Sequence, residues 1–581
     1  MKPGTLATKA INQYRARDLI PYLALRYYLE STCARSDRWA SEIAVHLTQT
    51  CGSPAYFEAH HFKETKQDGS VLHRSIFLPA PGEALAETVL LAECSKYEVF
   101  EPLPCVYSYR LAKSGDGSGI FEPYFNGFRQ RHRDVAAACR NLGQGGVVVY
   151  TDIKRFYPTI RSDQASRVWS DSTLNTSIPK HLSELGYKLL DAHSQVCTAN
   201  NLGHGILTGP MFSHLIANQL LRSVDEVMSA LFPNRYFRYV DDVILIGTAG
   251  EVKDGKERLG QLLSDLHLEL HADDAEKTFS VDTGAWLKGE NDFDESDGRA
   301  WMFFVGDLRR FLVSKPDEQQ KLAVALSSEG FNIPLPNYLA AASESGPMQR
   351  LTDFLKRYRW AGKSIKQISV TWLVAYAKAL RIVFEERLTR LLQIQPDVRG
   401  YDRKRLIPKL RYFGGRMLYL GTPEMQKEYA QKLAYFPELH LLATVLEAVA
   451  TRDVSRLVSL GSNAVQSAAQ VLRLSPVPVR YCGVTWGRAE LQGLSILKLN
   501  GVKVSPESER PTLEDSLSRF SDSDVSMSKL MRDSDPYVRE LACLHGAGSE
   551  ARHSQILNTA FDRDEQLAFD VLNQLSQSGY D

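Results

Sequence analysis

Three short segments, in a fixed order, carry side chains that could act together on one substrate. VVVYTDIKRFYPTI (147–160) delivers Asp152 after a β-branched run, GHGILTGPMFSHLIANQLL (203–221) is rich in glycine, and YVDD carries Asp241 and Asp242 side by side. Carboxylate oxygens are the ligands that Mg²⁺ prefers in proteins. Two such ions about 3.5–4 Å apart can activate an attacking hydroxyl and neutralise a leaving pyrophosphate. If the three acids meet, they indicate nucleotidyl transfer at a two-metal site.

The strands and helices predicted around these segments would bring the three acids together. The run 147–150 follows two glycines and predicts a buried strand that ends near Asp152. Apolar spacing over 210–231, with proline in the first turn, predicts one helix. Residues 235–247 predict a β-hairpin with the acidic pair at or near its turn, and 248–280 predicts a helix followed by a strand.

The three segments resemble motifs A, B and C of the reverse-transcriptase palm, including its Y-x-D-D signature, over roughly residues 60–285. The resemblance implies that Asp152 and Asp241 bridge the metal ions and that Asp242 is the third acid beside them. Tyr157 falls five residues after Asp152, where the family places the bulky residue that excludes a ribose 2′-hydroxyl. That position implies selection of deoxynucleotides.

The same resemblance implies a wider set of nucleotide contacts. Lys277 sits where motif D often carries a lysine near the triphosphate, and Arg74 lies in a segment like the fingers segment that meets the triphosphate. Leu207 and Thr208 depart from the Pro-Gln-Gly run that many members carry, which puts the usual side-chain contact to the nucleotide in doubt. The implied substrate-binding residues are Tyr157, Ile153, Phe156 (which also packs into the core), Thr208, Gly209, Arg74 and Lys277.

The rest of the chain predicts a second, helical half. The pattern becomes almost wholly helical after about residue 315, whereas the acidic stretch 288–299 predicts an exposed loop. RDSDPYVRELACL (532–544) has the loop-to-helix signature of HEAT-like repeats, with Val538 and Ala542 facing a stacked neighbour. The predicted fold class is an α+β right-hand polymerase core of fingers and palm followed by an all-α, HEAT-like repeat domain. The expected boundaries are 1–145 for the fingers, 146–315 for the palm and 316–581 for the repeats.

Segment 106–121 resembles one found in the bacterial abortive-infection and "unknown group" reverse transcriptases, and nothing indicates an RNase H or maturase domain. We identify the AbiK-like defence enzymes as the nearest resemblance. It implies antiphage defence and DNA synthesis from dNTPs without a template, primed by a protein hydroxyl. The single-stranded product would then be attached to a tyrosine, for which Tyr580 is one candidate. The alternatives are RNA-templated cDNA synthesis, as in retrons and group II introns, and a non-catalytic nucleic-acid-binding scaffold.

Two basic and aromatic stretches, 354–366 and 401–416, follow the predicted palm. Lysine and arginine neutralise phosphates, and tyrosine or tryptophan can stack on bases. The alternative is a solvated helix face whose long side chains cover apolar surface. The candidates for nucleic-acid binding are Arg357, Arg359, Arg403, Lys404 and Arg405.

Composition sets the limits on function. The chain has 581 residues with 69 basic and 69 acidic side chains, so any basic surface is local. Its 8 cysteines include no C-x2-C pair, which argues against a zinc knuckle. No apolar run approaches the ~20 residues of a membrane span. We expect a cytoplasmic bacterial protein, a homo-oligomer without membrane contact, that uses two Mg²⁺ ions, with Mn²⁺ as the alternative.

Overall fold

The structure is a computed structural model. It describes residues 3–15, 17–30, 55–66, 68–112, 119–203, 205–272, 278–290, 295–343, 363–393, 398–483, 486–507, 516–520, 526–546 and 549–560. The chain divides into two compact units. The first contains residues 1–14, 24–57 and 76–293, and the second contains residues 15–23, 58–75 and 294–581.

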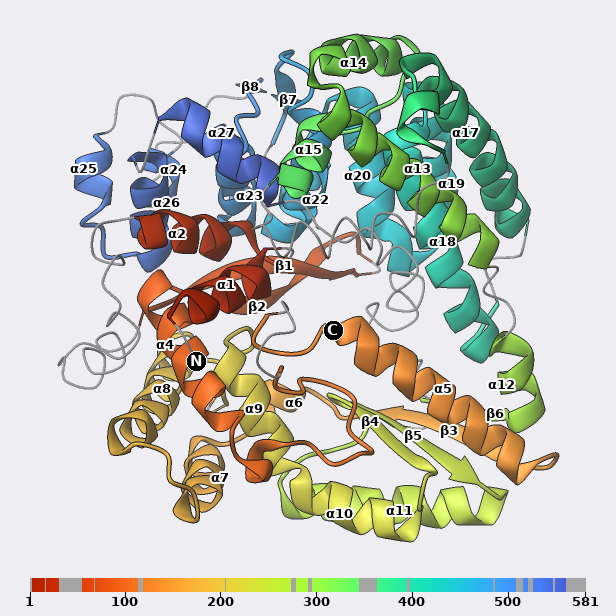
Figure 1. Cartoon of the computed structure of the whole chain (residues 1–581). Helices are drawn as coiled ribbons and strands as arrows, with labels where there is room; N and C mark the ends of the chain where they lie inside the picture. The colour runs from red at the N-terminus through yellow and green to blue at the C-terminus, as the bar shows by residue number, and fades with distance from the viewer. Residues whose placement is uncertain are drawn as a thin grey trace. The chain divides into compact units, whose positions relative to one another are not determined.

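The first unit surrounds a four-stranded antiparallel sheet of order β4-β5-β3-β6 (Figure 1). The strands are β3 (Val147–Asp152), β4 (Tyr236–Tyr239), β5 (Asp242–Gly247) and β6 (Phe279–Asp282). The helices are α1 (Pro3–Tyr14), α4 (Pro81–Cys94), α5 (Tyr124–Leu142), α6 (Phe156–Thr159), α7 (Ser162–Leu174), α8 (Lys180–Ala199), α9 (Met211–Leu220), α10 (Arg222–Leu231), α11 (Ala249–Asp265) and α12 (Thr283–Glu290).

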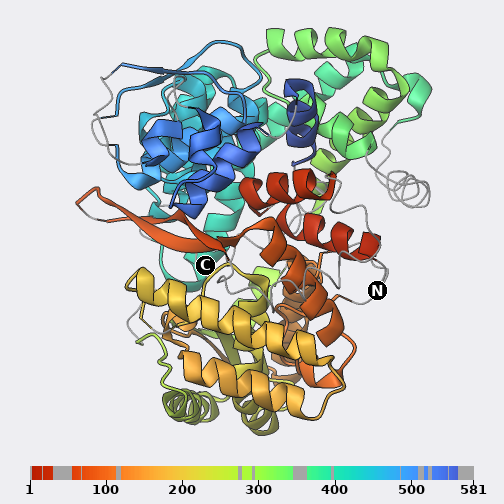
Figure 2. The ribbon, with the colours of Figure 1, turned by 90° about the vertical axis from the view of Figure 1, so that its left-hand side faces the viewer.

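Helices cover both faces of this sheet. Figure 1 shows α5 along one face and α10 and α11 along the other, and Figure 2 shows α7 and α8 packed side by side. The β-branched residues at the centre of the sheet explain the strands, because Val148, Val243 and Ile246 are fully buried. The predicted strand, hairpin and helix-then-strand order are confirmed, with β3 running through to Asp152.

Two predictions of secondary structure were wrong. The single helix expected over 210–231 is two helices, α9 and α10, that meet at Leu221. Almost every residue of α9 is buried, whereas α10 buries only one side through residues such as Val224 and Met228. The apolar spacing runs through the junction without interruption, so the periodicity did not reveal it.

The acidic stretch 288–299 is largely helical rather than a loop. Helix α12 extends to Glu290 and α13 (Glu295–Ser314) begins at Glu295, while 291–294 lie outside the described residues. Acidic residues favour the first turn of a helix because they complement its dipole. Here they mark the start of α13, whose later residue Trp301 is fully buried.

A buried carboxylate on α4 caps the N-terminus of α9. The Tyr56 hydroxyl donates to Glu87 Oε1 (2.7 Å), and the Phe212 backbone N–H donates to Glu87 Oε2 (3.2 Å). Pro210, the residue before α9, offers no side-chain cap, so Glu87 satisfies an N–H group that would otherwise be orphaned. Burial raises the pKa of Glu87 from 4.5 to about 7.

We expect Glu87→Gln to stabilise the protein at pH 8 and to leave its stability unchanged near pH 4. A carboxyl with a higher pKa when folded binds its proton more tightly in the folded state. The wild type therefore loses stability as the pH rises from about 4.5 to 7, in total about 3 kcal/mol. The glutamine resembles the protonated acid and removes this loss. Urea unfolding at both pH values measures the effect.

Glu251→Gln is the matched control, because hydrogen bonds at the N-terminus of α11 lower the pKa of Glu251. Glu251→Gln should be less stable than the wild type at pH 8, whereas Glu87→Gln should be more stable. If the stability of Glu87→Gln depends on pH in the same way as that of the wild type, the raised pKa of Glu87 is contradicted.

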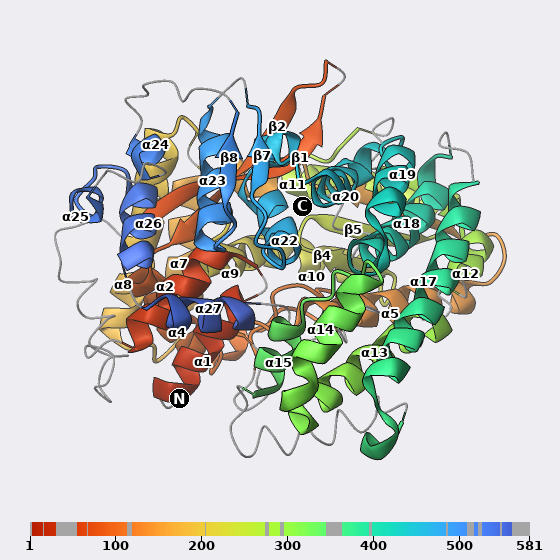
Figure 3. The same ribbon diagram turned by 90° about the horizontal axis from the view of Figure 1, so that it is seen from above.

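The second unit is almost entirely helical, as expected beyond residue 315. Its helices are α13 (Glu295–Ser314), α14 (Gln319–Ser328), α15 (Leu335–Ser343), α17 (Val370–Leu392), α18 (Gly400–Leu420), α19 (Pro423–Leu433), α20 (His440–Thr451), α21 (Ser455–Ser459), α22 (Ser462–Leu472), α23 (Arg488–Leu499), α24 (Ser516–Phe520), α25 (Met527–Leu530), α26 (Pro536–Gly546) and α27 (Glu550–Thr559). Figure 3 shows α17 beside α18. A short parallel pair, β7 (Val479–Tyr481) and β8 (Val504–Pro506), was not predicted.

In the repeat-like segment the expected start of a helix at Pro536 is confirmed, whereas a HEAT-like repeat domain stays a prediction. Helix α26 begins at Pro536, and Val538 and Ala542 are fully buried. Helix α2 (Leu19–Glu30) and the hairpin of β1 (Tyr56–Thr65) and β2 (Val71–Pro79) have residues in both units. Among the described residues, no helix is both long and apolar enough to cross a membrane.

Candidate functional site

The structure brings the three predicted acids together at one end of the sheet. Asp152 is the last residue of β3, Asp242 is the first residue of β5, and the two lie directly opposite each other across the ladder. Asp241 occupies the hairpin turn between β4 and β5. One carboxylate oxygen from each acid lies within 4.8 Å of the others. Asp152 and Asp242 are 2% and 7% exposed, whereas Asp241 is half-buried and opens the cluster to water.

The turn that presents Asp241 is strained and is held from behind. Val240 has a φ of +54°, a left-handed conformation that is costly for a β-branched residue. Its N–H donates to Ser108 Oγ (2.8 Å), and its carbonyl accepts from Arg238 Nη1 (2.8 Å). The Asp241 carbonyl accepts from the Ile153 N–H (3.1 Å). The first two bonds hold the backbone of the turn, and the third joins the turn to the end of β3.

A buried ion pair anchors Arg238. Its Nε and Nη2 atoms donate to the two oxygens of Asp225 at 2.8 and 2.6 Å, and both residues are 1% exposed. Burial opposes the charge of Arg238, but Asp225 raises the pKa of the guanidinium above its usual value. Nη1 also donates to Asn218 Oδ1 (3.2 Å) on α9. The network therefore ties the acid-bearing hairpin to α9 and α10.

Charges gather around Tyr150, which lies two residues before Asp152. Burial raises the pKa of its hydroxyl well above the usual value, Asp242 and Asp152 raise it further, and Arg131 acts in the opposite direction. Arg131 is 1% exposed, and its guanidinium lies 5.3 Å from the ring centroid of Tyr239. A buried cation therefore lies beside Tyr239, at the end of β4 that leads into the acidic turn.

His271 lies beside Asp152 on the other side of β3. The backbone N–H of His271 donates to the Asp152 carbonyl (2.9 Å), and the ring Nε2 of His271 lies 3.5 Å from Asp152 Oδ2. Sequence reasoning missed this contact, which depends on how the segment after α11 returns along β3.

The donor set suits hard divalent cations. Two carboxylates on adjacent strands and a third in the hairpin turn, with oxygens within 4.8 Å of one another, can hold two ions of the Mg²⁺ type. Directly opposed carboxylates destabilise a sheet unless a cation lies between them. The arrangement of Asp152, Asp241 and Asp242 therefore fits the metal site that the sequence predicted.

Residues after Asp152 take distinct positions. Ile153 and Phe156 are 2% and 3% exposed, so their side chains belong to the core. Tyr157 is half-buried at the start of α6, and its hydroxyl lies 2.6 Å from His214 Nδ1 on α9. Of these three side chains, Tyr157 is the one that reaches partly into solvent.

The glycine-rich loop before α9 packs against β2. The Thr208 carbonyl accepts from the Phe77 N–H (2.8 Å). Gly209 has a φ of +126°, and a Cβ atom there would lie 2.3 Å from the Phe77 carbonyl oxygen. Leu207, one of the departures from the family pattern, is 1% exposed. A buried leucine at this position packs the loop and offers no polar group.

We expect Gly209→Ala to destabilise the first unit by more than about 2 kcal/mol, because an L-residue is strained at this φ and its Cβ collides with backbone. Gly260→Ala in α11 is the matched control. Nothing lies within 4 Å of a Cβ there, and alanine should stabilise the helix by about 0.5–1 kcal/mol. Chemical unfolding measures both. Equal stability of the two variants would contradict the close approach of the loop to β2.

The other predicted residues fall into three groups. Arg403 forms a two-pronged ion pair with Glu438 (2.6 and 2.8 Å), which gives it a structural role, and its role in nucleic-acid binding stays a prediction. Lys404 and Arg405 are half-buried on α18, and Arg74 lies in the part of β2 that belongs to the second unit. For these three the binding role also stays a prediction. Lys277, Arg357, Arg359 and Tyr580 lie outside the described residues.

Three residues behind the site were missed, and two of them carried a signal. Arg238 lies two residues after buried Tyr236, on the same face of β4, and Asp225 shares the buried side of α10 with Val224 and Met228. A charge on each buried face indicates a buried ion pair. His214 carried no comparable signal.

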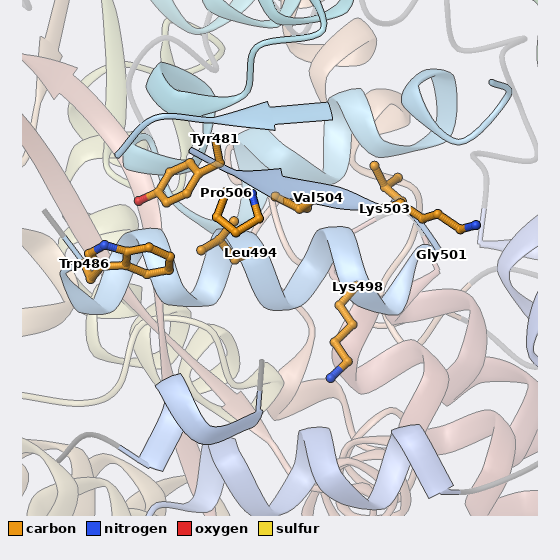
Figure 4. Close-up of a pocket in the computed structure, with 9 residues that line it drawn as sticks. Tyr481, Trp486, Leu494, Lys498, Gly501, Lys503, Val504 and Pro506 are labelled. Carbon is orange, nitrogen blue, oxygen red and sulfur yellow. The ribbon is translucent and has the colours of Figure 1, made fainter. Parts of the chain in front are cut away.

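A cavity of about 400 Å³ lies in the second unit, lined by nine residues of the β7–β8 region and α23 (Figure 4). Tyr481 and Trp486 meet edge to face at one end, with ring centroids 5.1 Å apart. Lys498 points away from the strands and donates to the Phe520 carbonyl (2.6 Å). None of the described residues that line this cavity carries a carboxylate, thiol or imidazole.

Comparisons with known proteins do not show which family the chain belongs to. No protein-family model and no curated protein matches the chain. A telomerase from Candida albicans, solved in complex with a TWJ fragment of telomeric RNA, is 11% identical, with a TM-score of 0.26. That alignment covers 73% of this chain and 70% of the telomerase chain. A similarity at this level carries no argument, so the functional inference rests on the geometry of the site.

Proposed function

We propose that the chain is a metal-dependent nucleotidyltransferase of the polymerase type. The observation that supports this most is the convergence of Asp152, Asp241 and Asp242 within 4.8 Å at the end of one sheet. Their order along the chain, with Tyr157 and the glycine-rich loop between them, matches the reverse-transcriptase motifs. A cluster of acids that merely ended strands would need neither the strained turn at Val240 nor its buried supports.

The chain's own residues supply binding and orientation. Asp152, Asp241 and Asp242 would hold two divalent ions, which lower the pKa of an attacking hydroxyl and neutralise the charge on a departing pyrophosphate. Ser108 and Arg238 hold the backbone of the turn that presents Asp241. Tyr157 would lie against the sugar of the incoming nucleotide and exclude a 2′-hydroxyl.

The finer proposal follows the resemblance to the abortive-infection enzymes. The substrates are dNTPs, the first nucleotide joins a protein hydroxyl, and extension needs no template. The biological role is then antiphage defence in the bacterial cytoplasm, with the helical half acting in product binding or self-association. RNA-templated cDNA synthesis is the alternative within the same chemistry.

The test is incorporation of single labelled dNTPs by purified full-length protein with Mg²⁺ or Mn²⁺, without primer or template. We expect protein-linked DNA from the wild type and none from Asp241→Ala with Asp242→Ala. Asp254→Asn, an exposed acid on α11, is the matched control and should retain activity.

The outcomes separate the proposals. Incorporation that requires added RNA would favour templated synthesis. A wild type that incorporates nothing under any of these conditions, while folded, would contradict the polymerase and favour a binding scaffold.

A further inference from the structure

The tyrosine predicted to select the sugar is held by a buried histidine. The Tyr157 hydroxyl lies 2.6 Å from His214 Nδ1, and the two rings meet nearly perpendicular with centroids 5.4 Å apart. His214 is 2% exposed and lies in the first turns of α9. The half-buried Tyr157 ring is thus fixed by its backbone at one end and by His214 at the other.

His214 is itself held in place by aromatic packing. Its ring stacks on that of Tyr109, with centroids 3.7 Å apart and planes 6° from parallel. Phe121 meets both rings edge to face, at 5.3 Å from Tyr109 and 6.1 Å from His214. Tyr109 adopts a φ of +50°, which is uncommon for such a residue. The stack therefore fixes the imidazole orientation that meets the Tyr157 hydroxyl.

The helix that carries His214 also supports the acids. Asn218 lies one turn further along α9, on the same side as His214. It accepts a hydrogen bond from Arg238 (3.2 Å) and donates to the Ser108 carbonyl (3.1 Å). The N-terminus of α9 is capped by Glu87. One rigid helix thus sets both the tyrosine and the turn that presents Asp241.

We propose that His214 is a positioning residue that sets sugar selectivity by locking the Tyr157 ring. The inference rests on the proposed function, because it assumes that a nucleotide lies against Tyr157. A steric wall discriminates between deoxyribose and ribose only if it does not tilt away when a 2′-hydroxyl presses on it. Because a tyrosine ring can swing about χ1 and χ2, the bond to His214 supplies the rigidity that packing alone would not.

A histidine that served only as core packing would behave differently. Its replacement would lower stability and affect all nucleotides alike. If the hydrogen bond to His214 holds the Tyr157 ring in place, loss of this bond changes the ratio of kcat/KM for dNTPs to kcat/KM for NTPs. The same role also predicts that removing either partner of the hydrogen bond has the same effect, and that removing both adds nothing further.

The experiment compares His214→Asn and His214→Leu in the full chain. The two side chains have the same shape, but asparagine places a polar atom near the position of Nδ1 and leucine does not. We expect His214→Leu to lower the dNTP-to-NTP ratio about threefold to tenfold, the loss of one buried hydrogen bond, and His214→Asn to retain most of it. Tyr157→Phe keeps the ring and should match His214→Leu, as should the double variant.

His193→Leu is the control, because His193 is another fully buried histidine of the first unit, packed edge to face against Tyr56. Neither of its ring nitrogens has a hydrogen-bond partner among the described residues, so the ratio should stay at the wild-type value. Equal ratios for His214→Asn and His214→Leu, or an unchanged ratio in Tyr157→Phe, would overturn the proposal.

The proposed function and the lock can fail separately. If the wild type polymerises dNTPs and His214→Leu has the same dNTP-to-NTP ratio as the wild type, the role of His214 is refuted and the proposed function is not. A wild type that polymerises nothing refutes the function. In that case the dissociation constants of ATP and dATP are measured with Mn²⁺ for the wild type and each variant. The role of His214 is refuted if the ratio of the two constants is the same in all of them.

Discussion

Asp152→Asn is expected to abolish nucleotide incorporation and, in metal-free buffer, to make the protein more stable. Asp152 and Asp242 face each other directly across β3 and β5, and Asp241 lies within 4.8 Å of both. Loss of one shared carboxylate removes several kcal/mol of charge stabilisation from the transition state, which is about a thousandfold in rate or more. Removal of one of three adjacent negative charges should relieve repulsion of about 1 kcal/mol in the metal-free protein.

The two effects are measured on the same samples. Incorporation of labelled dNTPs gives the rate, and thermal unfolding with and without Mg²⁺ or Mn²⁺ gives the stability. The wild type should gain stability from the metal, and the variant should gain much less. An active variant, or a variant whose unfolding responds to metal as the wild type does, would show that Asp152 is not a ligand.

The sequence predicted the acid cluster because its determinants are local. A β-branched run that ends in Asp152 and a hairpin with two acids at its turn can pair in few ways. The alternation of side chains then puts Asp152 and Asp242 on the same face of the sheet. That β3 pairs with this hairpin was an expectation from the resemblance to the palm motifs, because no local pattern specifies it.

The supports of the site were harder to predict because they depend on how helices lie across the sheet. His214 and Tyr157 are 57 residues apart, and their contact requires both the direction of α9 and the stack on Tyr109. The break between α9 and α10 at Leu221 was not predicted for a related reason. Apolar spacing reports which side of a helix is buried, not whether the helix continues without a break.

Arg238→Leu is expected to destabilise the first unit by about 3–5 kcal/mol, because it leaves the Asp225 carboxylate buried and uncompensated. The same change removes the donor to the Val240 carbonyl, so the strained turn should relax and Asp241 should shift. Activity should therefore fall even at temperatures where the variant remains folded. Arg235→Ala is the control, because the ion pair of Arg235 with Glu251 is more exposed and should be worth less than about 1 kcal/mol.

A paired replacement separates the stability of the fold from the geometry of the site. Asp225→Leu together with Arg238→Met removes both buried charges, and such hydrophobic replacements are often neutral in stability. We expect the pair to recover most of the stability lost in Arg238→Leu but little of its activity, because the Val240 carbonyl still lacks its donor. Recovery of both would show that Arg238 serves the fold alone. Recovery of stability without activity would show that the buried network exists to hold the turn, which explains why the protein keeps a charged pair where apolar side chains would fit.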